Sequence, residues 1–510
     1  MGVTPGKSLM RKGKADYSTQ TKGVIIGHGH LGQVEEVENM KPVQSSLVGK
    51  VPRNYDAFLP SNLPLEDNAA RIFGTNSKNA NLWPAPSLTF SNNSKRASLS
   101  SLKRSGIHLT SISQMNLLLL HHLVSSRSMR PRWSSVHDRE LLSAKLQIEN
   151  APFVKSTREL NAIVFRNVSR FKRSYELMER MMKVYIYEEG EKPIFHQPKM
   201  RGIYASEGWF MKLIEGNKKF VVKDPRKAHL FYLPFSSNML RTALFGENFK
   251  SRKDLEGHLK NYVVLIAKKY RFWTRTAGAD HFFVGCHDWA LKLTRHHMSN
   301  CIRVLCNANV ASGFKIGKDT TLPVTYIRSA ETPAENLGGK SPSERRILAF
   351  FAGSMHGYLR PILLQYWENK QSDMKILGPM SLDVAGKRMY RDYMKSSKYC
   401  ICARGYEVHT PRVVEAIFYE CVPVIISDNY VPPFFEVLNW ESFAVFVPEK
   451  DIPNLRNILL SIPEEKYLAM QLRVKMVQKH FLWHKKPVKY DLFHMILHSV
   501  WYTRVFQMKS

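Results

Sequence analysis

Two arginines and a glutamate lie close together in one segment of the chain and could bind a nucleoside diphosphate: Arg404, Arg412 and Glu415. Arginine binds phosphate oxygens through two parallel N–H donors, and a carboxylate beyond the phosphates can accept both ribose hydroxyls. Because Arg412 and Glu415 are three residues apart, they share one face if the segment is helical. The alternative is that these two side chains only pair with each other on a solvated helix.

The elements around these residues are predicted to place them at the edge of a parallel sheet. Residues 399–403 and 421–426 are short apolar runs rich in β-branched residues, which is typical of strands buried on both faces. Thr410 is a good N-cap, Pro411 suits the first helical position, and Gly405 lies in the loop after the first strand. A helix that starts just beyond the carboxyl edge of a sheet points free N–H groups at a bound anion.

A second phosphate-binding candidate follows another predicted strand. Residues 347–351 are apolar, and Arg360 comes after the glycine-containing turn that follows them. The alternative for Arg360 is an exposed position on the next helix.

The segment 399–440 closely resembles the exostosin-like, GT47-type glycosyltransferases, in particular the plant branch. Further matches occur in the family's order, and the resemblance covers about the last two thirds of the chain. These matches are residues 182–187, 204–209, 228–234, 278–283, 287–289 and 350–353. His409 departs from the resemblance, because a small polar residue such as Asn is expected there, and this change could alter contacts near the phosphates.

The resemblance implies an enzyme that transfers a sugar from a nucleotide sugar, UDP-linked, to a cell-wall polysaccharide or a glycoprotein glycan. It implies inversion at the anomeric carbon, no metal ion, no cofactor beyond the donor, and partners among other glycosyltransferases. The intact Arg404, Arg412 and Glu415 favour an enzyme. The alternative is a non-catalytic scaffold or polysaccharide-binding protein that retains the fold.

Four residues around a predicted strand at 281–284 are candidates for the catalytic base: Asp280, His281, His287 and Asp288. A His or a carboxylate at the edge of a sheet can have a pKa suited to accepting a proton from an acceptor hydroxyl. We rank the two aspartates first, although aspartates at strand ends often only cap turns. Glu207 is expected to bind the acceptor or to stabilise a turn.

The order of predicted elements indicates an α/β protein with two Rossmann-like domains facing a cleft, the GT-B arrangement. Strands and helices alternate from residue 183 onward, which predicts parallel sheets covered by helices. We expect a disordered stem over 1–130, an acceptor-side domain over 131–335 and a nucleotide-sugar domain over 336–510. Terminal helices are expected to pack back against the first domain.

The chain is strongly basic, with 75 Lys and Arg against 43 Asp and Glu and a net charge of +32. Such a balance is compatible with nucleic acid, an anionic membrane, an acidic polysaccharide or a basic nucleotide site. Because no RNA-reading motif occurs and the basic residues are scattered, nucleic acid is not expected as the partner.

Six cysteines are too few and too irregularly spaced for a disulfide framework. Cys400, Cys402 and Cys421 are expected as buried core thiols, and one disulfide is expected among Cys286, Cys301 and Cys306 if the protein enters an oxidising lumen. His296 and His297 precede Cys301 and Cys306, but the spacing does not fit a zinc finger. Asn92 and Asn167 begin N-x-Ser sequons, as chance alone would give.

The amino-terminal region lacks the expected targeting signals. Residues 1–60 contain no apolar run near the ~20 residues of a transmembrane helix, and no signal peptide is evident. Residues 115–124 are too short for a span and predict an amphipathic or core-docking helix. Location in the Golgi therefore follows from the resemblance alone. We expect the gene model to have lost its first exon, and the alternative is a protein that is targeted differently. Residues 27–32 match GxGxxG without a surrounding βαβ unit, so no dinucleotide site is expected.

Overall fold

The computed structural model describes residues 109–125, 131–157, 159–245, 251–327 and 329–508, which all belong to one compact unit, residues 92–510. The GxGxxG match, the Asn92 sequon and most of the expected stem lie outside these residues. The stem boundary at 130 is wrong, because helix α2 (Ile112–Ser125) buries Met115 and Leu119. This confirms the core-docking helix expected at 115–124.

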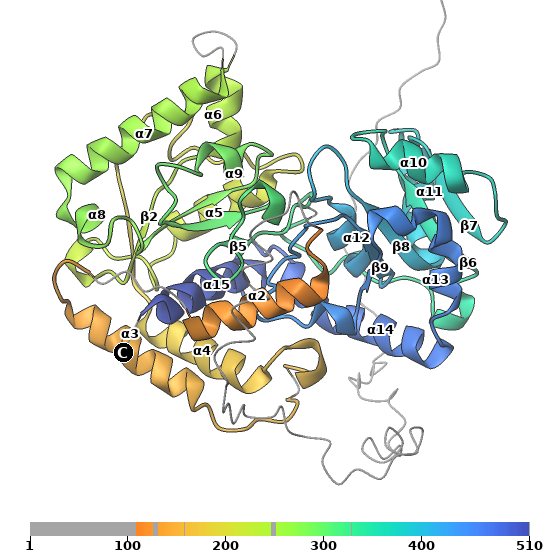
Figure 1. Cartoon of the computed structure of the whole chain (residues 1–510), viewed down its shortest axis with the longest axis horizontal. Coiled ribbons are helices and arrows are strands. Elements are labelled where there is room, and N and C mark those ends of the chain that lie inside the picture. The colour runs from red at the N-terminus through yellow and green to blue at the C-terminus, as the bar shows by residue number, and fades with distance from the viewer. Residues whose placement is uncertain (1–108, 126–130, 158, 246–250, 328, 509–510) are drawn as a thin grey trace, which may run out of the picture. The chain divides into compact units, whose positions relative to one another are not determined.

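The first sheet consists of five parallel strands in chain order, which are β1 (Val184–Ile186), β2 (Leu230–Tyr232), β3 (His281–Gly285), β4 (Ile302–Leu305) and β5 (Thr320–Thr321). Strands β2, β3 and β4 are completely buried, as their continuous apolar runs predict. The helices that connect them include α5 (Ala205–Glu215) and α7 (Arg252–Lys269) (Figure 1).

The second sheet is also parallel, and its strand order is β10-β9-β8-β6-β7. Its strands are β6 (Ile347–Ala352), β7 (Met374–Leu377), β8 (Ser397–Ala403), β9 (Val422–Ile426) and β10 (Val445–Phe446). The chain leaves β6 toward β7 on one side and then continues on the other side with β8, so the direction of winding reverses between β6 and β8. Parallel α/β sheets bind ligands at the carboxyl ends of the strands where this reversal occurs. The two sheets confirm the predicted α/β fold of GT-B type.

Helices cover both sheets. Within the described residues, the remaining α-helices are α3 (Val136–Glu149), α4 (Val168–Met181), α6 (Ser237–Leu244), α8 (Arg271–Thr276), α9 (Ala290–Leu293), α10 (Leu359–Trp367), α11 (Val384–Ser396), α12 (Arg412–Phe418), α13 (Leu455–Leu460), α14 (Glu464–Val477) and α15 (Leu492–Gln507).

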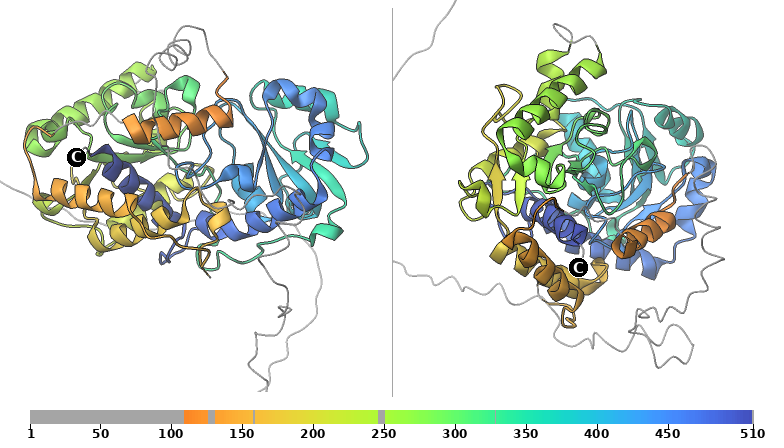
Figure 2. Two further views of the ribbon diagram at one scale, coloured as in Figure 1. Left: turned by 60° about the horizontal axis from the view of Figure 1, so that its bottom comes forward. Right: turned by 60° about the vertical axis from the view of Figure 1, so that its left-hand side comes forward.

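The carboxyl-terminal helix α15 returns to the first sheet. Asp491 caps it by accepting the His494 N–H at 3.0 Å, and residues 492–506 are all buried. The helix contacts α3, α4, β4 and β5, and both views of Figure 2 show it beside α3. The expected return of the terminal helices is thus confirmed for α15, whereas α14 packs on α12 and β9 of the second sheet.

The loops that follow β4 and β9 join the two sheets through main-chain hydrogen bonds. Val310 N–H donates to Asn429 O at 3.0 Å, and Val431 N–H donates to Ala308 O at 3.0 Å. Since both loops leave the carboxyl ends of their strands, the carboxyl edges of the two sheets meet here.

Two disulfides are present in the described part of the chain. Cys286 bonds Cys306, which confirms one disulfide among the three neighbouring cysteines, and removes Cys306 from any zinc site. The expectation of core thiols at 400 and 421 is wrong, because neighbouring strands β8 and β9 bring Cys400 and Cys421 to a Cα separation of 5.7 Å and the two are bonded. Cys402 remains a buried free thiol.

The described residues include no helix that is both long enough and apolar enough to cross a membrane.

Candidate active site

Arg412 begins α12 and reaches back to the carboxyl end of β6. Its Nε donates to the carbonyl of Ala352 at 3.0 Å, its Nη1 lies 3.4 Å from Thr410 Oγ1, and its guanidinium lies 5.0 Å from the centre of the Phe351 ring. A Cβ atom on Gly353 would lie 1.9 Å from Arg412 Nη2, so glycine is required at 353 for this placement. Arg412 thus lies at the reversal point of the second sheet.

Arg360, on α10, lies beside Arg412 and is not exposed, so the alternative of a solvated helix residue is wrong. Only 6% of Arg360 is exposed, and its guanidinium donates to Ser354 O at 2.8 Å and to Arg404 O at 3.2 Å. Burial, and then the charge of Arg412, lower the pKa of Arg360 to about 10. Both guanidinium groups are held by neutral oxygen acceptors, and neither forms an ion pair within the described part of the chain. Two positive charges therefore lie together without a carboxylate partner.

The start of α12 differs by one residue from the prediction. Pro411, not Thr410, is the N-cap, and its carbonyl accepts from Val414 N–H and Glu415 N–H, each at 3.1 Å. The side chain of Thr410 contacts Arg412 instead of capping the helix. Because Pro411 already has φ of −64° and ψ of −17°, the chain turns toward the helix at that residue.

Glu415 is half-buried and accepts a hydrogen bond from Tyr390 Oη at 2.9 Å. Burial, and then the charge of Glu415, raise the pKa values of Tyr390 and Tyr326. None of the ion pairs between described residues joins Glu415 to Arg412, so the alternative of mutual pairing is wrong. The carboxylate lies about one helical turn from Arg412 on α12, at the position for which a ribose-binding role was predicted.

Arg404 leaves β8 as predicted, but its charge is already compensated. Its Nη1 lies 3.3 Å from Glu449 Oε1, and its guanidinium lies 5.4 Å from the centre of the Tyr358 ring. Next to it, Gly405 is buried, and a Cβ there would lie 3.0 Å from Arg360 Nη2. The loop after β8 therefore packs tightly against the side chain of Arg360.

Asp288 and His409 bring the two sheets' loops together. His409 Nε2 lies 3.2 Å from Asp288 Oδ1, and Tyr204 also hydrogen-bonds this carboxylate. Burial raises the pKa of Asp288, but the hydrogen bond and charge of His409 and the bond from Tyr204 outweigh it and hold that pKa below its usual value. Asp288 is thus an anion. It belongs to the first sheet's loops, whereas Arg360 and Arg412 belong to the elements around the second sheet.

His287 precedes Asp288 and is buried against the ring of Tyr204, with a centroid distance of 5.1 Å. Burial lowers the pKa of His287 to about 4. Its Nδ1 accepts from the Trp289 N–H at 3.1 Å, so the neutral ring carries its proton on Nε2. His287 therefore has no free lone pair for an acceptor hydroxyl.

A second ion pair joins the same loops. Lys292 Nζ, on α9, lies 3.0 Å from Glu407 Oε1, and only 7% of Glu407 is exposed. Sequence reasoning missed Glu407, Lys292 and Tyr204, although Glu407 lies in the same loop as Arg404, between β8 and α12.

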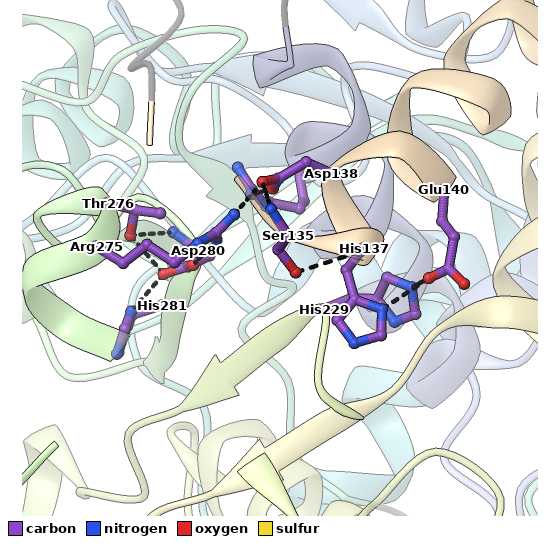
Figure 3. A network of polar contacts seen from close by, with 10 residues as sticks. Ser135, His137, Asp138, Glu140, His229, Arg275, Thr276, Asp280 and His281 are labelled. Carbon is purple, nitrogen blue, oxygen red and sulfur yellow. Dashed lines mark hydrogen bonds and ion pairs between the residues drawn. The ribbon is translucent and has the colours of Figure 1, made fainter. Parts of the chain in front are cut away.

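The prediction that Asp280 and His281 face the site is wrong. They lie at the amino end of β3, and both are completely buried (Figure 3). Asp280 accepts from Thr276 Oγ1 at 2.6 Å and Arg275 Nη1 at 3.3 Å, and it lies 2.8 Å from His281 Nδ1. These two residues belong to a structural network that links α8 to β3.

One group of described residues has the composition of a metal centre: His137, Glu140 and His229 (Figure 3). His229 Nδ1 accepts from the Lys183 N–H at 3.2 Å, so its Nε2 carries the proton and donates to Glu140 at 2.9 Å. A metal ion would need that same Nε2 lone pair. These hydrogen bonds therefore fit a structural link between α3 and the start of β2, not a metal site.

Glu207 stabilises a turn, one of the two roles expected for it. It is completely buried, and it accepts from Ser236 Oγ, Ser237 Oγ and the N–H of Cys286, the last at 2.7 Å. Ser237 Oγ in turn accepts from the N–H of His287 at 3.1 Å. Glu207 thus anchors the loop that carries Asp288.

A model of the family described as the exostosin GT47 domain matches residues 178–462, which contain every side chain of this site. A protein of Arabidopsis thaliana named a probable glycosyltransferase is 44% identical over 345 residues, which are 67% of this chain and 66% of that relative. This chain therefore spans slightly under two thirds of that relative's length.

Two further relatives carry names that specify a sugar. A probable beta-1,4-xylosyltransferase of Arabidopsis thaliana is 27% identical over 62% of this chain and 81% of its own length. A probable glucuronosyltransferase of Oryza sativa subsp. japonica is 28% identical over 62% of this chain and 80% of its own length.

Proposed function

The chain belongs to the exostosin GT47 family, and we propose that it transfers a sugar from a nucleotide-sugar donor to a glycan. The observation that carries this proposal is the pair of guanidinium groups, Arg360 and Arg412, at the reversal point of the second sheet, which form no ion pair with any acidic residue that the structure describes. A nucleoside diphosphate would supply the missing negative charge. Glu415 would accept the ribose hydroxyls.

The reaction is an inverting displacement. The acceptor hydroxyl attacks the anomeric carbon while the bond to the diphosphate breaks and its electron pair stays on the leaving oxygen. Arg360 and Arg412 stabilise that developing charge by electrostatic preorganisation, so the transfer needs no metal ion. A base must stand on the acceptor side, where the loop after β3 places the carboxylate of Asp288 in contact with His409.

The donor is UDP-linked, and the acceptor is a cell-wall polysaccharide or a glycoprotein glycan. The xylosyl and glucuronosyl names of the two plant relatives support a polysaccharide of the plant wall and make UDP-xylose and UDP-glucuronic acid the first donors to examine. Such enzymes extend a shared polymer, so other glycosyltransferases are the expected protein partners.

We place the protein in the Golgi. The disulfides Cys286–Cys306 and Cys400–Cys421 support a compartment of the secretory pathway, because disulfides persist in oxidising environments. Asn167 offers a readout, since it is exposed, begins a sequon and uses its Oδ1 to cap α4 by accepting the Arg170 N–H at 2.9 Å. A glycan removed by an endoglycosidase and lost in Asn167→Gln would support this placement, whereas an unmodified Asn167 with reduced cysteines would contradict it.

The test of function is release of UDP from each UDP-sugar by residues 109–510, with and without xylan or pectin fragments as acceptor. The proposed function predicts acceptor-stimulated UDP release that Glu415→Ala abolishes. A protein that binds polysaccharide equally well with and without Glu415, and releases no UDP, would instead be the non-catalytic scaffold.

A further inference from the structure

His409 has one nitrogen in contact with Asp288 and one nitrogen with no contact. Its side chain is 4% exposed, and its Nδ1 is buried without a hydrogen-bond partner among the described residues. Leaving a buried acceptor unpaired costs about 1–3 kcal/mol, so such an atom needs a reason. A ligand that brings its own donor to Nδ1 would remove this cost.

The contact with Asp288 fixes which nitrogen is free. An ionised carboxylate only accepts hydrogen bonds, so His409 Nε2, at 3.2 Å from Asp288 Oδ1, carries the ring proton. In the neutral ring Nδ1 then holds a lone pair. A carboxylate on one nitrogen orients the ring and stabilises the imidazolium that forms when the other nitrogen takes a proton.

We propose that His409 is the general base of the transfer and that Asp288 is its positioning residue. This inference rests on the proposed function. The acceptor hydroxyl donates to His409 Nδ1, its proton moves to that nitrogen as the oxygen attacks the anomeric carbon, and the bond to the diphosphate breaks. The proton leaves the imidazolium for solvent after the product departs.

The placement of His409 fits this role. It lies three residues before the first residue of α12 and so comes from the donor side, while its partner Asp288 follows β3 on the acceptor side. Because the contact between His409 and Asp288 joins a loop of the second sheet to a loop of the first, the base is oriented only when these two loops are in contact. The proposal therefore assigns the orientation of the base to the single contact between His409 and Asp288.

Several ionisable groups face the ring. From the loop after β3, Asp288 contacts the ring and His287 interacts with it electrostatically, while Tyr204 hydrogen-bonds the same Asp288 carboxylate and Glu407 acts on Tyr204. Lys292 neutralises Glu407, and His287 stays neutral above pH of about 4, so Asp288 is the charge that acts on His409 near neutrality.

Asn is the matched replacement for His409, because it keeps a polar side chain of smaller size and cannot take a proton. The proposal predicts that His409→Asn lowers kcat by about 10²-fold or more with little change in the KM for the donor. It also predicts that the acidic limb of the pH profile of kcat, which reports the imidazole, disappears. Asp288→Asn should lower kcat while keeping an imidazole limb, displaced from its wild-type position.

Two results would overturn the proposal. If His409→Asn keeps the wild-type kcat and pH profile, the residue is only a contact between loops. If His409→Asn keeps or gains activity and its acidic limb moves to higher pH, Asp288 is the base itself, because removing the imidazole raises the pKa of that carboxyl.

Donor binding separates failure of this inference from failure of the proposed function. His409→Asn should bind UDP as the wild type does in a calorimetric titration. A wild type that neither binds UDP nor releases it from any UDP-sugar would contradict the function, whereas an active wild type with an equally active His409→Asn contradicts only the role of His409.

Discussion

The guanidinium of Arg412 occupies the space that a side chain at residue 353 would need, because a Cβ on Gly353 would lie 1.9 Å from Arg412 Nη2. The turn after β6 and the start of α12 are therefore fitted to each other. This fit holds the arginine against the carbonyl of Ala352 and beside Arg360.

Gly353→Ala should displace Arg412 and weaken UDP binding at least tenfold, or about 1.4 kcal/mol. The dissociation constant is measured by calorimetric titration. Gly257→Ala is the matched control, because a Cβ on that glycine meets no atom within 4 Å. Equal UDP affinity in both variants would show that the position of Arg412 does not matter for the donor.

Lys292→Met should destabilise the protein by about 1–3 kcal/mol, because it leaves the buried carboxylate of Glu407 without its cation. Urea unfolding of the two proteins gives the difference. Lys219→Met is the control, since Lys219 pairs with Glu179 at the surface and should change stability by less than about 1 kcal/mol. Equal effects of the two substitutions would contradict a specific link between the loops.

Replacing both Cys286 and Cys306 by Ala should cost about 3 kcal/mol of unfolding free energy, because the bond closes a loop with a sequence separation of 20. Thermal unfolding of the wild type with and without a reducing thiol measures the combined effect of this disulfide and Cys400–Cys421. Cys301→Ala leaves both disulfides in place and should keep the sensitivity to thiol. A wild type whose Tm does not respond to the thiol would contradict the bonded state.

Stability should fall as the pH is lowered from 6.5, partly through His498. Burial lowers the pKa of His498 to about 3, so below 6.5 the unfolded chain binds a proton that the folded protein does not. Stability therefore rises with pH in this window, by up to about 1.4 kcal/mol per pH unit for this one group. His498→Gln should flatten the pH dependence of the unfolding free energy, and replacement of the exposed His356 should not. If the unfolding free energy depends on pH with the same slope in both variants, His498 does not contribute to the loss of stability at low pH.

Much of the fold follows from the sequence because buried parallel strands are continuous apolar runs. Such runs predict β3, β6, β8 and β9. The prediction missed β5, which consists of two threonines, β7, where Lys375 interrupts the apolar pattern, and β10, which has two half-buried residues.

The donor side of the candidate site was predictable because Arg404, Arg412 and Glu415 follow β8 along the chain, and β8 is one of the strands recognisable as an apolar run. The base was not. Asp280 precedes β3, and only residues that follow a strand reach its carboxyl edge. The contact of His409 with Asp288 joins two distant segments, so no local spacing indicates it.

The measurement that tests the central claim most directly is a calorimetric titration of UDP into the wild type and Arg412→Ala, with Arg388→Ala as the control. Arg388 lies on the exposed face of α11, where it is close to Asp392. The account predicts that the wild type and Arg388→Ala bind UDP alike. Arg412→Ala should lose about 1.5–3 kcal/mol of binding free energy, as expected for hydrogen bonds to a charged group. Undiminished UDP binding by Arg412→Ala would contradict the nucleotide site proposed at the reversal point of the second sheet.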